Sequence, residues 1–379
     1  MSVQAIGEAI RREEDPRLLR GRGRYADDMH LPREARGYPV ESLGVVDFNS
    51  VARYGEKTEI SYYHTFLNSQ NFAQVSNEVF IGSSGLKLRV YGGAGPTVPT
   101  GSLSVLGYDG MTAVFGVVSS YPVISSRPQT LNLYTSFDGL DSDVHTLSNL
   151  RQSEDDVRAV RLGEEYGLSD IILGADRPAI SVLRVRLSLG IPIFGATADG
   201  NTPTSARLNE QASFSKIDFE TSRTQTLFSP WNGASVAIFG LLTGQSTPDI
   251  LPPTEQFYLG GTRFTRGYYS GQVQGDKALA ATGELQLNTN IAMSLFGKPL
   301  NIPAQWYVFY DWGETWQNQA VDFATRISSA GGGLRCPLTQ NVEVDLEALA
   351  RYNRFPAGTG NGVSPLSGSA FYWRVLSRF

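Results

Sequence analysis

The sequence predicts an all-β protein that forms a transmembrane antiparallel β-barrel of about fifteen strands. From about Val45 to the last residue, apolar and polar residues alternate with the period of two that is typical of strands. Several alternating segments are about 10–14 residues long. A membrane-crossing strand needs roughly 9–11 residues, whereas a soluble strand usually has about 5–6. The 40 glycines and the aromatic content of 11% fit many strands joined by tight turns.

Composition and local motifs exclude several classes of protein. No run of apolar residues is long enough for a membrane-spanning helix, and the net charge of -5 argues against a nucleic-acid-binding protein. The single cysteine, Cys336, excludes an internal disulfide framework and a thiolate metal cluster. We find no catalytic or metal-binding motif, and therefore expect no enzyme activity, no cofactor and no metal. We expect Asp138, Asp141 and Asp143 to form an acidic loop face, and Glu154-Asp155-Asp156 to lie in a solvated loop.

Turn-like breaks divide the chain into fifteen segments, each of which we expect to be one strand. Breaks such as Gly82-Ser83-Ser84-Gly85 and Asp199-Gly200-Asn201 consist of residues that favour turns. The expected strands are 44–53, 57–67, 72–81, 86–95, 112–123, 130–141, 156–168, 181–195, 212–227, 234–243, 278–291, 304–316, 326–337, 341–351 and 370–379.

The alternation gives each expected strand an apolar face and a polar face that contacts water. In 183–193, leucine, valine and isoleucine occupy the odd positions, with arginine and serine between the first of them. In 342–348, the acids Glu343, Asp345 and Glu347 alternate with apolar residues, and such a row must face water. A large soluble β-sandwich or propeller would alternate in the same way. The strand length and the aromatic last residue favour the membrane barrel.

One expected strand carries a carboxylate opposite its most hydrophobic row. Between Trp306 and Trp312 the even positions are Trp, Val, Tyr and Trp, whereas Asp311 is at an odd position. Because side chains on a strand alternate between its faces, Asp311 points into the barrel if the aromatic row faces lipid. A carboxylate there needs a cation. Our candidate is Arg266, in the glycine-flanked stretch 260–268.

The longest connection in the chain runs from Gly244 to Lys277 and contains this arginine. If the last strand ends on the periplasmic side, the alternation of strand directions makes strand 278–291 enter the membrane from outside. The connection is then extracellular, which is the side where the long loops of such barrels are expected.

Several short motifs in and after this connection stand in a fixed order. They are Glu255-Gln256-Phe257-Tyr258-Leu259-Gly260-Gly261, Arg266-Gly267-Tyr268, Gly275-Asp276, Gly283-Glu284-Leu285, the Phe309–Asp311–Gly313 spacing and the terminal Phe379. Together they resemble the outer-membrane transporters of two-partner secretion, which are the haemolysin secretion/activation proteins of the Omp85 superfamily. The resemblance covers about residues 45–379. It implies a barrel of 15–16 strands with the long loop folded into the lumen.

The resemblance also implies roles for particular residues. In the family the loop arginine pairs with the strand aspartate inside the lumen, and these residues are here Arg266 and Asp311. The residues implied to hold or gate the loop with them are Gly260, Gly261, Phe264, Gly267, Tyr268, Phe309 and Gly313. The residues implied to form a C-terminal membrane-insertion signal are Phe371, Trp373, Val375 and Phe379. Thr265 stands where family members usually carry valine, and we expect this β-branched residue of similar size to leave the geometry intact.

Residues 6–33 resemble a different family. The matching residues are Ile6-Gly7, Glu14-Asp15-Pro16-Arg17-Leu18-Leu19, Gly21-Arg22-Gly23-Arg24-Tyr25, Asp27-Asp28 and Leu31-Pro32. They resemble the start of the molybdenum-binding subunits of xanthine dehydrogenases and aldehyde oxidases, but include none of that family's cofactor or catalytic positions. We therefore expect 1–40 to be an unrelated segment, from a fusion or a misplaced start, followed by an outer-membrane barrel over 41–379.

The function implied by the main resemblance is a pore in the bacterial outer membrane that exports and activates an unfolded partner exoprotein. The family has an export signal, a plug helix, two periplasmic substrate-binding domains and sixteen strands. We find none of the first three in this sequence, and Met1 to Arg20 has no apolar core of a signal peptide, so we expect a truncated copy. The expected partners are the exoprotein, outer-membrane lipid and the outer-membrane assembly machinery. The alternatives are an Omp85-type assembly factor for outer-membrane proteins and a non-functional barrel remnant.

Overall fold

A computed structural model describes most of the chain after residue 40. The described ranges are 41–52, 54–65, 70–98, 109–145, 151–200, 204–269, 271–295, 298–319, 323–339, 341–356 and 365–377. The expected separate segment 1–40 and the terminal Phe379 lie outside these ranges. Within them, no helix is long and apolar enough to cross a membrane.

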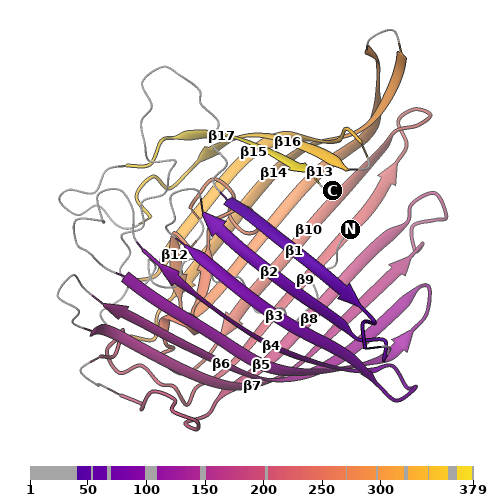
Figure 1. Ribbon diagram of the computed structural model, residues 1–379. Coiled ribbons are helices and arrows are strands. Elements are labelled where there is room, and N and C mark those ends of the chain that lie inside the picture. Colours follow the sequence, from indigo (N-terminus) through magenta and orange to yellow (C-terminus); the bar gives the residue numbers. More distant parts are fainter. Residues whose placement is uncertain are drawn as a thin grey trace.

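The protein is built around one antiparallel sheet of fifteen strands in barrel form (Figure 1). The strands are β1 (Glu41–Asn49), β2 (Lys57–Thr65), β3 (Asn71–Ile81), β4 (Leu86–Thr97), β5 (Asp109–Ser125), β6 (Gln129–His145), β7 (Arg151–Asp170), β8 (Ala179–Gly190), β9 (Ser215–Phe228), β10 (Ser235–Ser246), β13 (Lys277–Leu295), β14 (Lys298–Trp316), β15 (Thr325–Pro337), β16 (Val342–Arg351) and β17 (Ser369–Ser377). Each strand pairs with its neighbours in chain order, and β1 and β17 form the two ends of this order. The predicted fold class and all fifteen predicted strands are confirmed.

The structure corrects several predicted boundaries. The acidic residues expected in loops lie instead in β6 and β7, where Asp155 is almost fully buried. The strand expected over 181–195 ends at Gly190, because Pro192 cannot donate a strand hydrogen bond and Phe194 adopts a positive φ of 50°. The pairing of β8 with β7 continues one step past this end, with the Ile191 amide donating to the Arg158 carbonyl at 2.8 Å.

The hairpin of β13 and β14 is longer than expected. The two strands stay paired from Lys277 and Trp316 to Leu295 and Lys298. The hairpin therefore projects beyond the neighbouring turns, at the end of the sheet away from the long connection (Figure 1).

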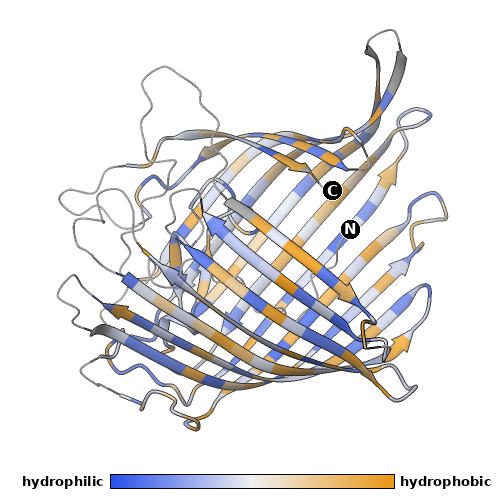
Figure 2. Cartoon of the chain, in the orientation of Figure 1, coloured by the Kyte–Doolittle hydropathy of each residue, from blue (hydrophilic) through white to orange (hydrophobic). Residues whose placement is uncertain are grey.

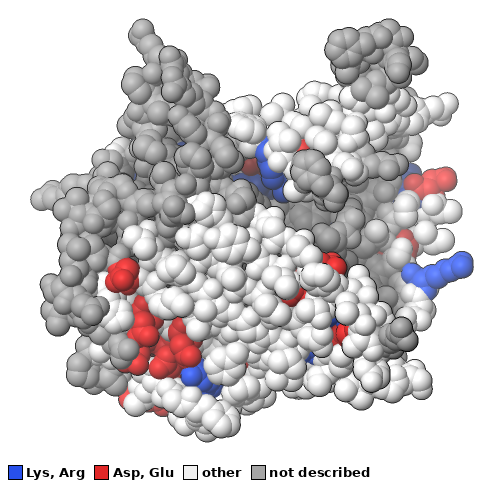
Figure 3. Space-filling view, in the orientation of Figure 1, with Lys and Arg blue, Asp and Glu red and all other residues white. Residues whose placement is uncertain are grey.

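The two faces of the sheet differ in polarity as the alternation predicted. On β14, Trp306, Val308 and Tyr310 are 47–58% exposed, whereas Asp311 on the other face is fully buried. Apolar and polar residues alternate along the strands in the same way around the sheet (Figure 2). The face of the molecule over β1–β7 presents a broad area without charged side chains, with acidic side chains gathered near one end (Figure 3). An apolar outer band with a polar interior is the pattern of a barrel that lies in lipid.

Aromatic rings lie over glycines of the next strand at several places on the sheet. A Cβ atom on Gly163 would lie 2.3 Å from Cζ of Tyr134, which is its direct partner across β6 and β7. Tyr91 covers Gly116 in the same way across β4 and β5. A ring that covers the glycine opposite protects the backbone there and helps to hold the strands in register.

The long connection between β10 and β13 has its own secondary structure. It contains a 3-10 helix, η3 (Pro253–Glu255), and a small hairpin of β11 (Phe257–Leu259) and β12 (Val273–Gly275). We call residues 247–276 the lumen loop, because its side chains bind the inner faces of the strands. Leu259 and Tyr268 of this loop pack with Ala280 and Ile327 of the barrel wall in one buried cluster.

Candidate functional site

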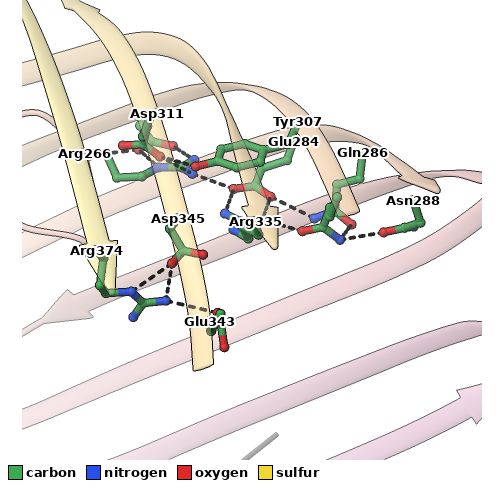
Figure 4. Close-up of polar contacts among 12 residues, drawn as sticks. Arg266, Glu284, Gln286, Asn288, Tyr307, Asp311, Arg335, Glu343, Asp345 and Arg374 are labelled. Atoms are coloured by element: carbon green, nitrogen blue, oxygen red, sulfur yellow. Dashed lines mark hydrogen bonds and ion pairs between the residues drawn. The ribbon is translucent and has the colours of Figure 1, made fainter. Parts of the chain in front are cut away.

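The lumen loop is attached to the inner wall through Arg266. The Nε and Nη2 atoms of Arg266 donate to the two carboxylate oxygens of Asp311, both at 2.8 Å, and its backbone amide donates to Asp311 Oδ2 at 2.8 Å. Figure 4 shows the two side chains facing each other. Arg266 is 7% exposed and Asp311 is fully buried. A buried arginine–carboxylate fork is a strong and directional contact.

Other wall residues complete the surroundings of the Arg266 guanidinium. Its Nη1 atom donates to Glu284 on β13 at 2.6 Å and lies 3.5 Å from a carboxylate oxygen of Glu347 on β16. Its Cζ atom lies 3.6 Å from the centre of the Phe309 ring, a distance typical of a cation–π contact. The guanidinium is therefore enclosed by three acids and the Phe309 ring, with the Tyr307 ring 5.9 Å away.

The backbone and the tyrosine next to Arg266 are bound as well. Ser329 Oγ donates to the Arg266 carbonyl at 2.5 Å, and the Arg351 side chain donates to the Gly267 carbonyl. The Tyr268 hydroxyl donates to the Ser328 carbonyl at 2.8 Å. Burial raises the pKa of Tyr268, so its hydroxyl keeps the proton that this bond needs.

Glycines allow the tip of the loop to reach the wall. Gly267 has a φ of +92°, and a Cβ atom there would lie 2.4 Å from a methyl group of Leu349. Gly313 lies on the wall, where a Cβ atom would lie 2.8 Å from Leu259 and 3.0 Å from Thr265. A side chain at either position would push the loop away from the strands.

Thr265 contributes hydrogen bonds to the turn that presents Arg266. Its hydroxyl donates to the Phe264 carbonyl at 2.6 Å and accepts from the Gly260 amide at 2.9 Å, which valine could not do. Thr265 is almost fully buried and has a positive φ of 55°, which is rare for a β-branched residue. The hydroxyl thus helps to hold the turn closed, and the Arg266 fork forms with threonine at this position.

Glu255 forms a second attachment of the lumen loop, on the wall of β7 and β9. Its carboxylate lies 2.7 Å from Nη2 of Arg161 and 2.8 Å from Nζ of Lys216. Lys216 also donates to the Glu255 carbonyl at 2.8 Å, and both residues are 2% exposed at their side chains. Arg161 is oriented by Asp138 at 3.0 Å.

Asp276 forms a third attachment, where the loop joins β13. Its carboxylate accepts two hydrogen bonds from the side chain of Arg207, at 2.6 and 3.1 Å. It also accepts hydrogen bonds from the backbone amides of Leu251 at 3.0 Å and Asn318 at 2.8 Å. This fully buried carboxylate joins three connections at one rim of the barrel.

A fourth contact holds the tip of the loop to β9. Arg263 Nη2 lies 2.5 Å from a carboxylate oxygen of Glu220, which also binds Arg184 at 2.8 Å. The Arg263 side chain is 60% exposed, so this ion pair contributes much less than the buried ones.

The structure brings most of the predicted site residues together. Those at the Arg266 contact or in the turn that presents it are Arg266, Asp311, Gly260, Gly261, Phe264, Gly267, Tyr268, Phe309 and Gly313. Phe371, Trp373 and Val375 lie apart from it, in an exposed row on β17. The roles of Glu255, Lys216 and Arg161 were missed. Glu255 stood in a motif quoted above, but nothing local in the sequence indicates which wall residues face it.

Within the described part of the chain, no group of three His, Cys, Asp or Glu side chains is arranged to hold a metal ion. The acids around Arg266 instead bind guanidinium groups. The site is thus a set of ion pairs between the lumen loop and the barrel wall.

Comparison with known proteins finds similarity to one sequence family and to several solved barrels. Residues 177–336 match the model of the haemolysin secretion/activation protein family ShlB/FhaC/HecB. This segment includes the lumen loop, Arg266 and Asp311. No curated protein matches the sequence.

The similar structures are outer-membrane barrels of low sequence identity. CdiB from Escherichia coli has a TM-score of 0.66 and 16% identity, over 89% of this chain and 59% of CdiB. CdiB from Acinetobacter baumannii has a TM-score of 0.60 and 14% identity, over 89% of this chain and 56% of that one. BamA from Haemophilus ducreyi lacking POTRA domains 1-3 has a TM-score of 0.57 and 11% identity, over 89% of this chain and 67% of that one.

The chain thus spans less than two thirds of either CdiB chain. Taken together, the chain has the fold of the CdiB and BamA barrels, and its segment 177–336 is similar in sequence to the haemolysin secretion/activation proteins.

Proposed function

We propose that this protein is a bacterial outer-membrane pore that exports a partner protein in unfolded form, without ATP, and that the lumen loop is its gate. The observation that carries the proposal is the Arg266–Asp311 contact, which lies inside the barrel within the segment that matches the haemolysin secretion/activation family. The similarity to CdiB supports the same function. The partner would be the secreted exoprotein of a two-partner secretion system.

The gate would work through a change in the position of the loop. A wide barrel encloses an aqueous channel that must be obstructed when it is idle. The buried fork between Arg266 and Asp311 stabilises the obstructing position, whereas the exposed Arg263–Glu220 pair adds little. The exoprotein would favour the displaced position by competing for the wall.

Single-channel conductance of the refolded protein in planar bilayers tests the gate. We expect Arg266→Ala to spend a larger fraction of time in open states than the wild type. The matched control is Arg326→Ala, because Arg326 is 63% exposed and pairs with Glu314 at the rim. Equal gating of Arg266→Ala and the wild type would contradict the gate.

Export is tested in a bacterium that makes the protein together with a candidate secreted protein from the same genome. We expect that protein to reach the medium only when the barrel is present.

The second candidate function is that of an assembly factor for outer-membrane proteins, and the similarity of the fold to BamA favours it. Loss of other outer-membrane proteins upon deletion, with secretion intact, would favour that candidate.

A further inference from the structure

The side chains that hold the Arg266 guanidinium all belong to the barrel wall. Glu284 lies on β13, Phe309 and Asp311 lie on β14, and Glu347 lies on β16. Strand pairing places Glu284 directly opposite Phe309. Because the backbone ladder fixes these positions, they persist when the lumen loop moves away.

Two of the three carboxylates are oriented by partners outside the loop. Glu284 accepts from both terminal nitrogens of Arg335 at 3.1 Å, and from Gln286 at 2.8 Å (Figure 4). Glu347 accepts from the Tyr307 hydroxyl at 2.7 Å. These bonds join wall residues to one another, so the two carboxylates keep their orientation without Arg266.

Withdrawal of the loop leaves this part of the wall with excess negative charge. Three carboxylates, on Glu284, Asp311 and Glu347, then remain, and among the described residues the guanidinium that still pairs with them is that of Arg335, on Glu284. The hydrogen bonds accepted by Asp311 come from Arg266. Carboxylates that lie close together repel one another and give the wall a negative potential there, so the vacated position attracts a cation from the channel.

The shape of the vacated position suits a planar cation. Asp311 binds two nitrogens of Arg266 side by side, while Glu284 binds the third nitrogen at 2.6 Å. The flat face of the guanidinium lies on the Phe309 ring. An ammonium group cannot form the fork and stack on a ring at the same time.

We propose that these wall residues form a guanidinium-binding site in their own right, and that it binds arginine side chains of the polypeptide in transit once the loop has withdrawn. The identity of the polypeptide rests on the proposed function, whereas the site itself does not. Each arginine that binds the wall would delay the return of Arg266 and so keep the gate open while chain remains in the pore.

Binding of small cations to refolded Arg266→Ala tests the site without any secreted partner. The probes are methylguanidinium and methylammonium at equal ionic strength, and the readout is the midpoint of thermal unfolding. We expect methylguanidinium to raise the midpoint in a saturable manner and to bind about tenfold more tightly than methylammonium. An equal response to the two ions, or no saturable response, would overturn the site.

A control variant and a substitute procedure keep this experiment decisive. Arg266→Ala with Asp311→Asn keeps the space but removes the fork, and should lose the preference for methylguanidinium. If Arg266→Ala does not refold alone, it is refolded with methylguanidinium or with methylammonium present, and a rescue by methylguanidinium alone is expected, because only that ion can fill the fork. A preference that survives Asp311→Asn would also overturn the assignment.

Blockade of open wild-type channels by peptides tests the role in transit. An extended peptide with spaced arginines should block at about tenfold lower concentration than its lysine counterpart. Equal blockade would overturn this role. If the small-cation preference holds while the export experiment fails, the proposed function is wrong and the guanidinium site stands.

Discussion

The carboxylate of Asp311 accepts three hydrogen bonds from one residue, Arg266, each 2.8 Å long. One comes from the backbone amide, which every substitution at position 266 retains. The other two form the fork. Asp311 therefore binds both the backbone of the loop at position 266 and the side chain of that residue.

Asp311→Asn should lower the free energy of unfolding by about 3–5 kcal/mol, because it leaves the Arg266 charge buried without its main partner. Urea unfolding of the protein refolded in lipid vesicles measures this loss. A double-mutant cycle with Arg266→Ala should give a large coupling energy. The exposed Arg326–Glu314 pair is the control and should contribute less than about 1 kcal/mol.

Glu255→Gln should destabilise the protein by about 3 kcal/mol or more, because Arg161 and Lys216 would lose the acid between them. The same unfolding measurement applies. Glu165→Gln is the matched control, since Arg184 keeps Glu220 when Glu165 is neutralised. Similar losses in both variants would mean that Glu255 is not a special attachment.

Gly163→Ala should cost about 1–3 kcal/mol, because the new methyl group would overlap the ring of Tyr134. Gly240→Ala is the comparison, since nothing lies within 4 Å of a Cβ atom there. We expect that substitution to be neutral within about 0.5 kcal/mol. If the two variants unfold at the same urea concentration, the ring does not cover the glycine as described.

Thr265→Val should weaken the turn that presents Arg266 by about 0.5–1.5 kcal/mol, the usual net contribution of one hydrogen bond. Thr265→Ser keeps the hydroxyl and should retain more of the closed conductance state than valine does. Bilayer recordings of both variants give the comparison. A valine variant that gates like the wild type would show that the hydroxyl bonds do not hold the turn.

Val308→Arg should reduce membrane insertion, because Val308 is 58% exposed in the apolar outer row of β14. A charge on the lipid face costs about 2–4 kcal/mol at the middle of the membrane. Folding yield into lipid vesicles measures the effect, with Val308→Leu as the control. Equal yields would argue that this face does not contact lipid.

The number and direction of the strands could be predicted from the sequence, because period-two alternation and turn residues are local signals. The strand ends at Gly190 and Leu295 were less predictable. Phe194 and Pro192 leave the ladder, while the β13–β14 hairpin extends past residues that resemble a turn. The acids at 154–156 were assigned to a loop because charge alone suggested solvent, yet Asp155 is buried at a strand end.

The candidate site was only partly predictable. Arg266 and Asp311 stand out through a motif and an interrupted aromatic row. The second attachment needed knowledge of which inward-facing residues lie opposite the loop, since Arg161 and Lys216 are remote from Glu255 in sequence. Alternation gives the face of a residue but not its partner across the lumen.

The attachments at Glu255 and Asp276 limit how far the loop tip can travel. If only the Arg266 fork opens, the tip remains tethered at both bases, and a fully extended segment from Glu255 to Arg266 reaches at most about 40 Å. The tip would then swing aside about these two fixed ends and stay within that distance of them. A polypeptide in transit would then pass beside the displaced lumen loop. The loop can return to the wall as soon as the pore is empty.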